Sequence, residues 1–167
     1  MTAKRVLLGE DVAPPAIVAA PSFEDVFRRE SLGMVRLAFL MVGSRPLAEE
    51  IVQEAFARLL QRWGRLEHPA AYLRASVLNG CKNAHRRRAV ERKHAARHAD
   101  VPFGALETDY LEDALAALPV KRRAALILRY YHDLPEAEIA EALGVRPGTV
   151  KSLVSRGLAQ LRQVIER

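Results

Sequence analysis

The sequence has a single cysteine, few aromatic residues and no long apolar run. One cysteine cannot form an intramolecular disulfide, which excludes disulfide-framed secreted folds and favours a reducing compartment. No apolar run approaches the roughly 20 residues that a membrane-spanning helix needs. The apolar stretch Val6–Leu8 is cut short by charged residues before it can form a signal-peptide core. We therefore expect a cytoplasmic protein without membrane insertion.

The sequence also lacks the residue patterns that mark catalytic and metal sites. No Ser-His-Asp set, glycine-rich phosphate loop or pair of suitably spaced carboxylates stands out. His94 and His98 are four residues apart, but two histidines without a third ligand make a poor zinc site. Cys81 falls on an apolar stripe and is interpreted as buried and inert. We therefore predict no enzyme activity, no metal and no cofactor.

The composition favours helices over strands. Aromatic residues make up 6% of the 167 residues, β-branched runs are scarce, and Ala, Leu, Glu and Arg dominate. Half of the residues are apolar, which is enough for a packed core, and the length allows one medium domain or two small ones. The predicted fold class is all-α.

The positive charge is unevenly distributed along the chain. Residues 72–98 carry a net charge of +7, residues 99–120 carry −5 and residues 121–167 carry +4, whereas residues 1–71 are balanced. An excess of positive charge suggests an anionic partner. Solvated helix faces would explain either basic block alone. Two basic blocks separated by an acidic segment instead favour two DNA-facing modules on a tether.

Residues 136–167 have the pattern of a helix-turn-helix. Glu136–Val145 predicts a short amphipathic helix that Gly144 ends, and Arg146–Thr149 restarts the chain with a proline just inside the next helix. That helix carries an apolar stripe of Val150, Val154, Leu158, Leu161 and Ile165. Its other face carries Lys151, Ser152, Ser155 and Arg156. A polar-faced second helix after such a turn is the unit that reads a DNA major groove.

Three longer helices are predicted in the N-terminal half. The first begins after Ser22, an N-cap with Asp25 as its capping-box partner, and Gly43 ends it. The second runs from residue 45 to Gly64, and the third from residue 69 to about residue 92, with Gly80 as a mark of close packing. Apolar periodicity turns these side chains inward: Phe23, Val26, Phe27, Met34, Leu37, Ala38, Met41, Leu47, Ala48, Ile51, Val52, Ala55, Phe56, Leu59, Leu60, Trp63, Ala71, Tyr72, Ala75, Leu78 and Cys81.

The chain divides into four segments. Residues 1–21 lack helical periodicity and are expected to form a disordered tail. Residues 22–92 form the first helical domain, and residues 93–108, which contain Pro and Gly, form a flexible linker. Residues 109–167 form the second domain, in which helices over 111–118 and 121–131 precede the helix-turn-helix, with Ala124, Leu126, Ile127 and Tyr130 available for burial.

Two motif sets resemble the extracytoplasmic-function sigma factors of RNA polymerase. Leu128–Ser152, followed by Ser155–Arg162, resembles their region 4. Ala48–Leu60 resembles the polymerase-binding helix of their region 2, and Trp63, Pro69–Asn79 and Arg86–Arg88 resemble its promoter-opening segment. The resemblance covers about residues 22–167, and the N-terminal half is similar to members from actinobacteria.

The resemblance implies both an architecture and a function. A region 2 domain of three to four helices is joined by the linker to a region 4 helix-turn-helix domain. Such a protein binds core RNA polymerase and promoter DNA, recognises the minus-thirty-five element with region 4 and melts the minus-ten element with region 2 to start transcription. Family members are often held by an anti-sigma factor. The alternative is a stand-alone helix-turn-helix regulator, whose N-terminal half would carry a ligand pocket or a dimer seam.

The resemblance also assigns roles to individual residues. The residues matched to minus-thirty-five binding are Thr149, Lys151, Ser152, Ser155 and Arg156, of which Thr149 contacts a phosphate or caps the helix. Those matched to minus-ten binding and melting are Trp63, Tyr72, Asn79, Lys82, Asn83, Arg86, Arg87 and Arg88. Asn79 matches a residue that holds an extruded base, whereas Trp63 and Tyr72 fit the core equally well. The residues matched to polymerase binding are Glu49, Glu50, Gln53 and Glu54. Without the resemblance, this polar face would be interpreted as a solvent-exposed helix face.

Overall fold

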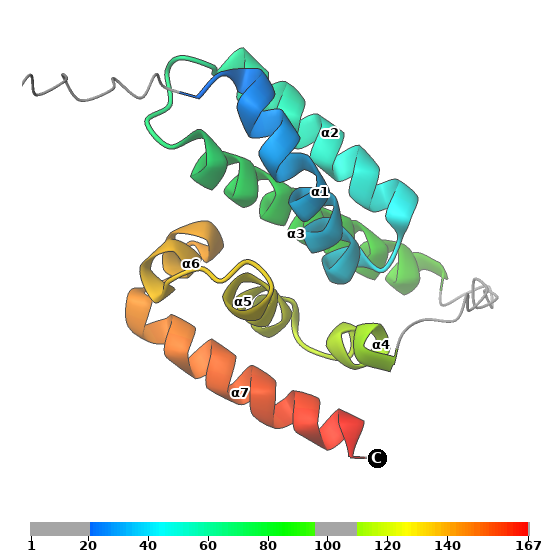
Figure 1. Ribbon diagram of the computed structural model, residues 1–167. Coiled ribbons are helices and arrows are strands. Elements are labelled where there is room, and N and C mark those ends of the chain that lie inside the picture. Colours follow the sequence, from blue (N-terminus) through cyan, green and yellow to red (C-terminus); the bar gives the residue numbers. More distant parts are fainter. Residues whose placement is uncertain (1–20, 96–109, 167) are drawn as a thin grey trace, which may run out of the picture.

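The computed structural model describes residues 21–95 and 110–166, in which every regular element is a helix (Figure 1). The N-terminal half contains α1 (Phe23–Val42), α2 (Arg45–Gln61) and α3 (Pro69–Ala95). The C-terminal half contains α4 (Tyr110–Ala116), α5 (Val120–Tyr130), α6 (Glu136–Leu143) and α7 (Pro147–Ile165). Most of the predicted tail (1–21) and linker (93–108), and the side chains of His94 and His98, lie outside the described part.

Both predicted ends of α1 are confirmed. The Ser22 hydroxyl accepts a hydrogen bond from the Asp25 backbone N–H at 3.1 Å, and the Asp25 carboxylate accepts one from the Ser22 N–H at 3.0 Å. These bonds favour the charged carboxylate and hold the pKa of Asp25 below its ordinary value. At the other end Gly43 adopts φ 69°, a left-handed conformation that glycine takes without strain.

The boundary of α2 differs from the prediction. The helix ends at Gln61, and Arg62–Arg65 form a turn in which Gly64 has φ 80°. The predicted close packing at Gly80 is confirmed, because a Cβ atom there would lie 2.6 Å from Cγ2 of Ile51 on α2. Glycine at this position therefore allows α3 to lie directly against α2.

The core of the N-terminal half follows the predicted stripes with corrections at their edges. Met34, Leu37 and Leu59 are fully buried, as are Leu73 and Val77 of α3, which periodicity did not single out. Two side chains predicted to point inward are exposed, Phe27 at 46% and Leu60 at 56%. Both lie where the apolar stripe is wider than the surface that the neighbouring helices cover. One side of Phe27 still packs against Phe56, with ring centroids 4.8 Å apart.

In the C-terminal half, α5 packs against α6 and α7. Leu128, Ile139 and Val150 are fully buried between these helices, and a Cβ on Gly157 of α7 would lie 3.1 Å from the Leu126 side chain. Two predictions of burial here are wrong, because Tyr130 at the end of α5 is 64% exposed and Ile165 in the last turn of α7 is 45% exposed. Each residue lies in a part of its helix that no other helix covers.

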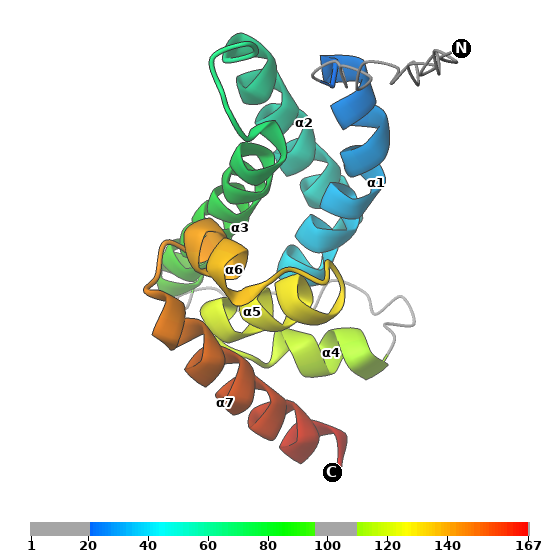
Figure 2. The same ribbon diagram turned by 60° about the vertical axis from the view of Figure 1, so that its left-hand side comes forward.

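The two halves pack against each other. α6 lies on α3, and α4 and α5 lie on α1, while α7 lies on the outer side of the C-terminal half (Figure 2). One cluster of buried apolar residues runs through both halves, so that Leu78 and Cys81 of α3 belong to the same core as Ala124 and Leu128 of α5. The predicted two helical units are present, and the structure adds that their cores merge.

Among the described residues, no helix is both long and apolar enough to span a membrane.

Candidate nucleic-acid interface

The outer face of α7 presents the residues predicted to read the minus-thirty-five element. Val150 is buried against the rest of the C-terminal half, and this orientation leaves the predicted set exposed to solvent. The exposed set is Thr149, Lys151, Ser152, Ser155 and Arg156. The N-cap of α7 is Arg146, whose side chain makes no capping bond, so the interpretation of Thr149 as the helix cap is wrong.

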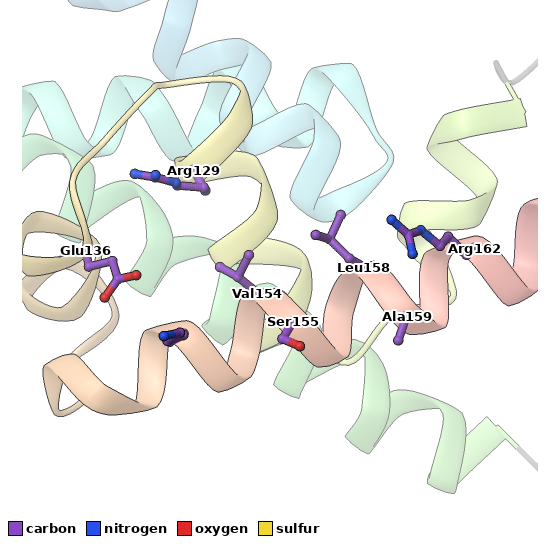
Figure 3. Close-up of a pocket in the computed structure, with 8 residues that line it drawn as sticks. Arg129, Glu136, Val154, Ser155, Leu158, Ala159 and Arg162 are labelled. Atoms are coloured by element: carbon purple, nitrogen blue, oxygen red, sulfur yellow. The ribbon is translucent and has the colours of Figure 1, made fainter.

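A hollow of about 410 Å³ lies beside this face, between α7 and the α5 and α6 helices. Arg129 of α5 and Glu136 of α6 face the α7 side chains across it (Figure 3). The α7 residues that line it are Lys151, Val154, Ser155, Leu158, Ala159 and Arg162. Three cationic side chains and one carboxylate surround the hollow, a balance that favours an anionic ligand such as a phosphate.

Sequence reasoning missed Arg129 and Arg162 as members of this site. Arg162 follows Ser155 by seven residues, so helical periodicity would have extended the polar face to it. Arg129 had no comparable signal, because its place beside α7 depends on how α5 packs. Its Nη1 donates a hydrogen bond to the Leu134 carbonyl at 3.1 Å, which holds the side chain over the turn before α6.

The second predicted DNA surface lies on α3. Asn79, Asn83, Arg86 and Arg87 are exposed, and the Asn83 amide oxygen accepts a hydrogen bond from Arg86 at 3.2 Å. Lys82 is half-buried beside α5, and its pKa is lowered by burial first and by the charge of Lys121 second. The α3 face therefore carries two amides and a run of arginines at its exposed edge.

Arg88 differs from its two neighbours because it also contacts α1. Its Nη1 donates to the Val42 carbonyl at 2.8 Å. His85, one turn earlier on α3, places Nε2 2.7 Å from the Met41 carbonyl oxygen, and since a carbonyl can only accept, Nε2 carries the proton. These bonds anchor the basic part of α3 to the end of α1.

Trp63 and Tyr72, the two aromatic candidates, are half-buried at the other end of α3. The Trp63 ring meets Phe23 edge-on with centroids 5.3 Å apart, and the Arg62 guanidinium lies 5.5 Å from the Tyr72 ring centroid. Each ring has a packing partner and an accessible part. A DNA contact by either ring stays a prediction.

The residues predicted to bind polymerase lie on the solvent side of α2. Glu50 and Gln53 are exposed, and the partly exposed Glu49 and the exposed Glu54 pair with arginines one turn away at 3.0 Å and 2.8 Å. Exposed pairs of this kind contribute little, about 0.3–0.5 kcal/mol each, so a partner can replace them at low cost.

The burial predicted for Cys81 is confirmed. Its side chain has no exposed surface, and burial raises the pKa of the thiol to about 12. A thiol that stays protonated near neutral pH is a poor nucleophile and metal ligand. Within residues 21–95 and 110–166, no three His, Cys, Asp or Glu side chains are grouped to hold a metal ion.

Two family models match the chain. The model described as "Sigma-70 region 2" matches residues 26–90, and the model described as "Sigma-70, region 4" matches residues 108–161. The first covers most of α1, all of α2 and most of α3, and the second covers α4 to α6 and most of α7.

Curated relatives extend the similarity over most of the chain. The RNA polymerase sigma-E factor of Streptomyces coelicolor is 31% identical over 149 residues, covering 84% of this chain and 84% of the relative. The ECF RNA polymerase sigma factor SigM of Mycobacterium tuberculosis is 31% identical over 153 residues, covering 86% of this chain and 77% of the relative.

A solved structure shares the fold. The sigma factor RpoE from Bartonella quintana, determined in complex with the anti-sigma factor NepR, superimposes with a TM-score of 0.73 at 21% identity. The superposition covers 86% of this chain and 96% of that one.

Proposed function

The chain belongs to the extracytoplasmic-function group of the sigma-70 family of RNA polymerase sigma factors, and we propose on this basis how its helices divide promoter recognition, DNA opening and transcription initiation among them. The observation that carries the proposal is the pair of separate cationic surfaces, one on the recognition helix α7 and one on α3.

α7 enters the major groove of the minus-thirty-five element. Lys151 and Arg156 flank Ser152 and Ser155 on its exposed face, and a good bidentate contact from a cationic side chain to guanine discriminates by about 1–3 kcal/mol. The two serines are short and offer single hydrogen bonds. Direct recognition of the bases therefore depends on few side chains, and the sequence-dependent shape of the DNA supplies the rest of the specificity.

Arg129 and Arg162 contact the phosphates that border this groove. Both line the same hollow as Lys151 and Ser155, from α5 and from the C-terminal part of α7. Phosphate contacts from two helices fix the orientation of the recognition helix without reading sequence. Thr149, at the start of α7, adds a contact of the same kind.

α3 opens the minus-ten element. Asn79 is exposed on the same helix as Asn83, Arg86 and Arg87, so an extruded base held by Asn79 would leave its strand next to the cationic residues. Extruding a base costs a few kcal/mol, which hydrogen bonds and stacking must offset. Trp63 and Tyr72 offer the stacking surfaces, while Lys82 and Arg88 add cationic charge.

α2 docks on core RNA polymerase through Glu49, Glu50, Gln53 and Glu54. The chain then acts in the cytoplasm as a non-catalytic subunit, with the polymerase supplying the chemistry. An anti-sigma factor is a further partner, which is supported by the structural match to a sigma factor bound to NepR.

Transcription with purified components tests the assignment. We expect the protein, added to core polymerase, to initiate from specific promoters, and the start sites to identify the two elements. A chain that binds specific DNA alone, but neither binds core polymerase nor starts transcription, would instead be a stand-alone regulator.

A further inference from the structure

A single carboxylate lies among the cationic side chains of the region 4 surface. Glu136, in the first turn of α6, lines the same hollow as Arg129, Lys151 and Arg162 (Figure 3). Its side chain is exposed, and none of the ion pairs within the described part of the chain includes it. The surface assigned to DNA thus contains a negative charge that no direct ion pair neutralises.

The first turn of α6 faces the DNA backbone when α7 occupies the major groove. In a helix-turn-helix, the second helix enters the groove and the first helix crosses the backbone. α6 is that first helix, and its first turn carries two carboxylates, Glu136 and Glu138. Glu138 pairs with Arg74 of α3 at 2.8 Å, so Glu136 is the carboxylate that remains directed at the hollow beside α7.

A carboxylate beside a phosphate weakens binding by electrostatic repulsion. In water, two unit charges 4 Å apart change an equilibrium constant by about fivefold, and the effect decreases with distance and with added salt. Glu136 also lowers the positive potential that Arg129, Lys151 and Arg162 create in the hollow. Both effects act on the phosphates, which every duplex carries, so they weaken binding to all sequences alike.

We propose that Glu136 limits the affinity of region 4 for the DNA backbone, and that this keeps the free chain from being retained on DNA without a promoter. The inference rests on the proposed function, in which α7 binds the minus-thirty-five element. A genome offers about a million or more competing non-specific sites, so even a weak affinity for the backbone would sequester the free chain. The polymerase and the α3 surface then supply the remaining affinity at a promoter.

Glu136 also has a structural role, which predicts the opposite result. A carboxylate in the first turn stabilises a helix by opposing the positive end of its dipole. If this were its only effect, Glu136→Gln would destabilise α6 and leave DNA binding equal or weaker. Repulsion from the backbone instead predicts that the same substitution strengthens DNA binding, although α6 becomes slightly less stable. The sign of the change therefore separates the two roles.

Binding titrations of the full chain with Glu136→Gln test the proposal. We expect the variant to bind both a promoter duplex, identified by start-site mapping, and a random duplex about two- to fivefold more tightly than the parent chain at low salt. The gain should shrink as the salt concentration rises, because the repulsion is screened. Glu136→Asp, which keeps the charge, should bind both duplexes like the parent chain.

Glu141→Gln is the matched control. Glu141 is also exposed on α6 and carries the same charge, but it lines a different hollow, between α1, α3 and α6, so its substitution should change DNA binding much less. A Glu136→Gln variant that gains no affinity, or gains no more than Glu141→Gln, would overturn the proposal. A change confined to the promoter duplex would also overturn it, since it would make Glu136 a base contact. If the parent chain neither prefers the promoter duplex nor starts transcription with core polymerase, the proposed function fails instead.

Discussion

At the scale of single residues, Gly80 sets the distance between α2 and α3. We predict that Gly80→Ala lowers the free energy of unfolding, because its Cβ would overlap Cγ2 of Ile51 at 2.6 Å. Overpacking costs about 1–3 kcal/mol, against a gain of about 1 kcal/mol in helix propensity. Urea unfolding measures the difference. Gly148→Ala is the control, because a Cβ there meets nothing within 4 Å, and it should not lose stability.

His132 makes stability depend on pH. Burial, and then the charge of Arg74, lower its pKa below the ordinary 6.5, while Glu30 acts in the opposite direction. As the pH falls below about 6.5, the unfolded chain takes up a proton that the folded chain refuses, so the free energy of unfolding decreases. Above 6.5 both states are neutral at this residue, and the effect vanishes.

We therefore predict that the loss of stability between pH 7.5 and pH 5.5 is smaller in His132→Leu than in the parent chain. Urea unfolding at the two pH values measures it. His68→Leu is the comparison, because His68 is exposed. If both variants lose as much stability as the parent chain, titration of His132 is not the cause.

At the scale of elements, the two kinds of DNA contact proposed for α7 can be separated by mutation. We predict that Arg156→Ala weakens binding of the chain to a specific promoter more than binding to random DNA, because Arg156 is proposed to contact base edges. Arg162→Ala should weaken both by the same factor and reduce the salt slope of binding by about 1. Binding titrations at several salt concentrations distinguish the two. Equal losses for Arg156→Ala on both DNAs would assign it to phosphate.

The proposed role of α3 can be tested by comparing duplex promoter templates with templates that are already melted. We predict that Asn79→Ala slows opening of duplex promoters in the presence of core polymerase and spares templates already melted at the minus-ten element. The reason is that only the duplex requires a base to be extruded. Asn83→Ala, a matched exposed amide on the same helix, should affect duplex opening less. Equal loss on both templates would remove Asn79 from base capture.

The helices were predictable because their signals are local. The capping box at Ser22 and the left-handed glycines at 43 and 144 mark helix ends wherever they occur, and periodicity identified most of the buried stripe. Periodicity failed at Phe27, Leu60 and Tyr130, since it shows which face is apolar but not how far a neighbouring helix covers it. The α7 face was predictable for the same local reason, whereas Arg129 joins it only through tertiary packing.

At the scale of the whole molecule, the merging of the two cores was not predictable from the sequence. The N-terminal block of basic residues on α5 is typical of a solvated surface, yet Arg123 is buried within it. The partners of Arg123 are main-chain carbonyls. Every residue has such a group, so no pattern of side chains in the sequence shows which carbonyls Arg123 will bind. The family resemblance predicted both halves and their order, and left their mutual placement open.

The last turn of α1 has no basic residue of its own. Its carbonyl oxygens nevertheless accept hydrogen bonds from side chains of both halves of the molecule. The Met41 oxygen is shared by Arg123 of α5 and His85 of α3, while Arg88 of α3 donates to Val42. Even without Arg123, the Met41 oxygen would keep its bond to His85, and Arg88 would still supply the positive charge opposite the end of α1. The N-terminal half therefore closes the end of α1 with its own side chains and does not depend on the C-terminal half to do so.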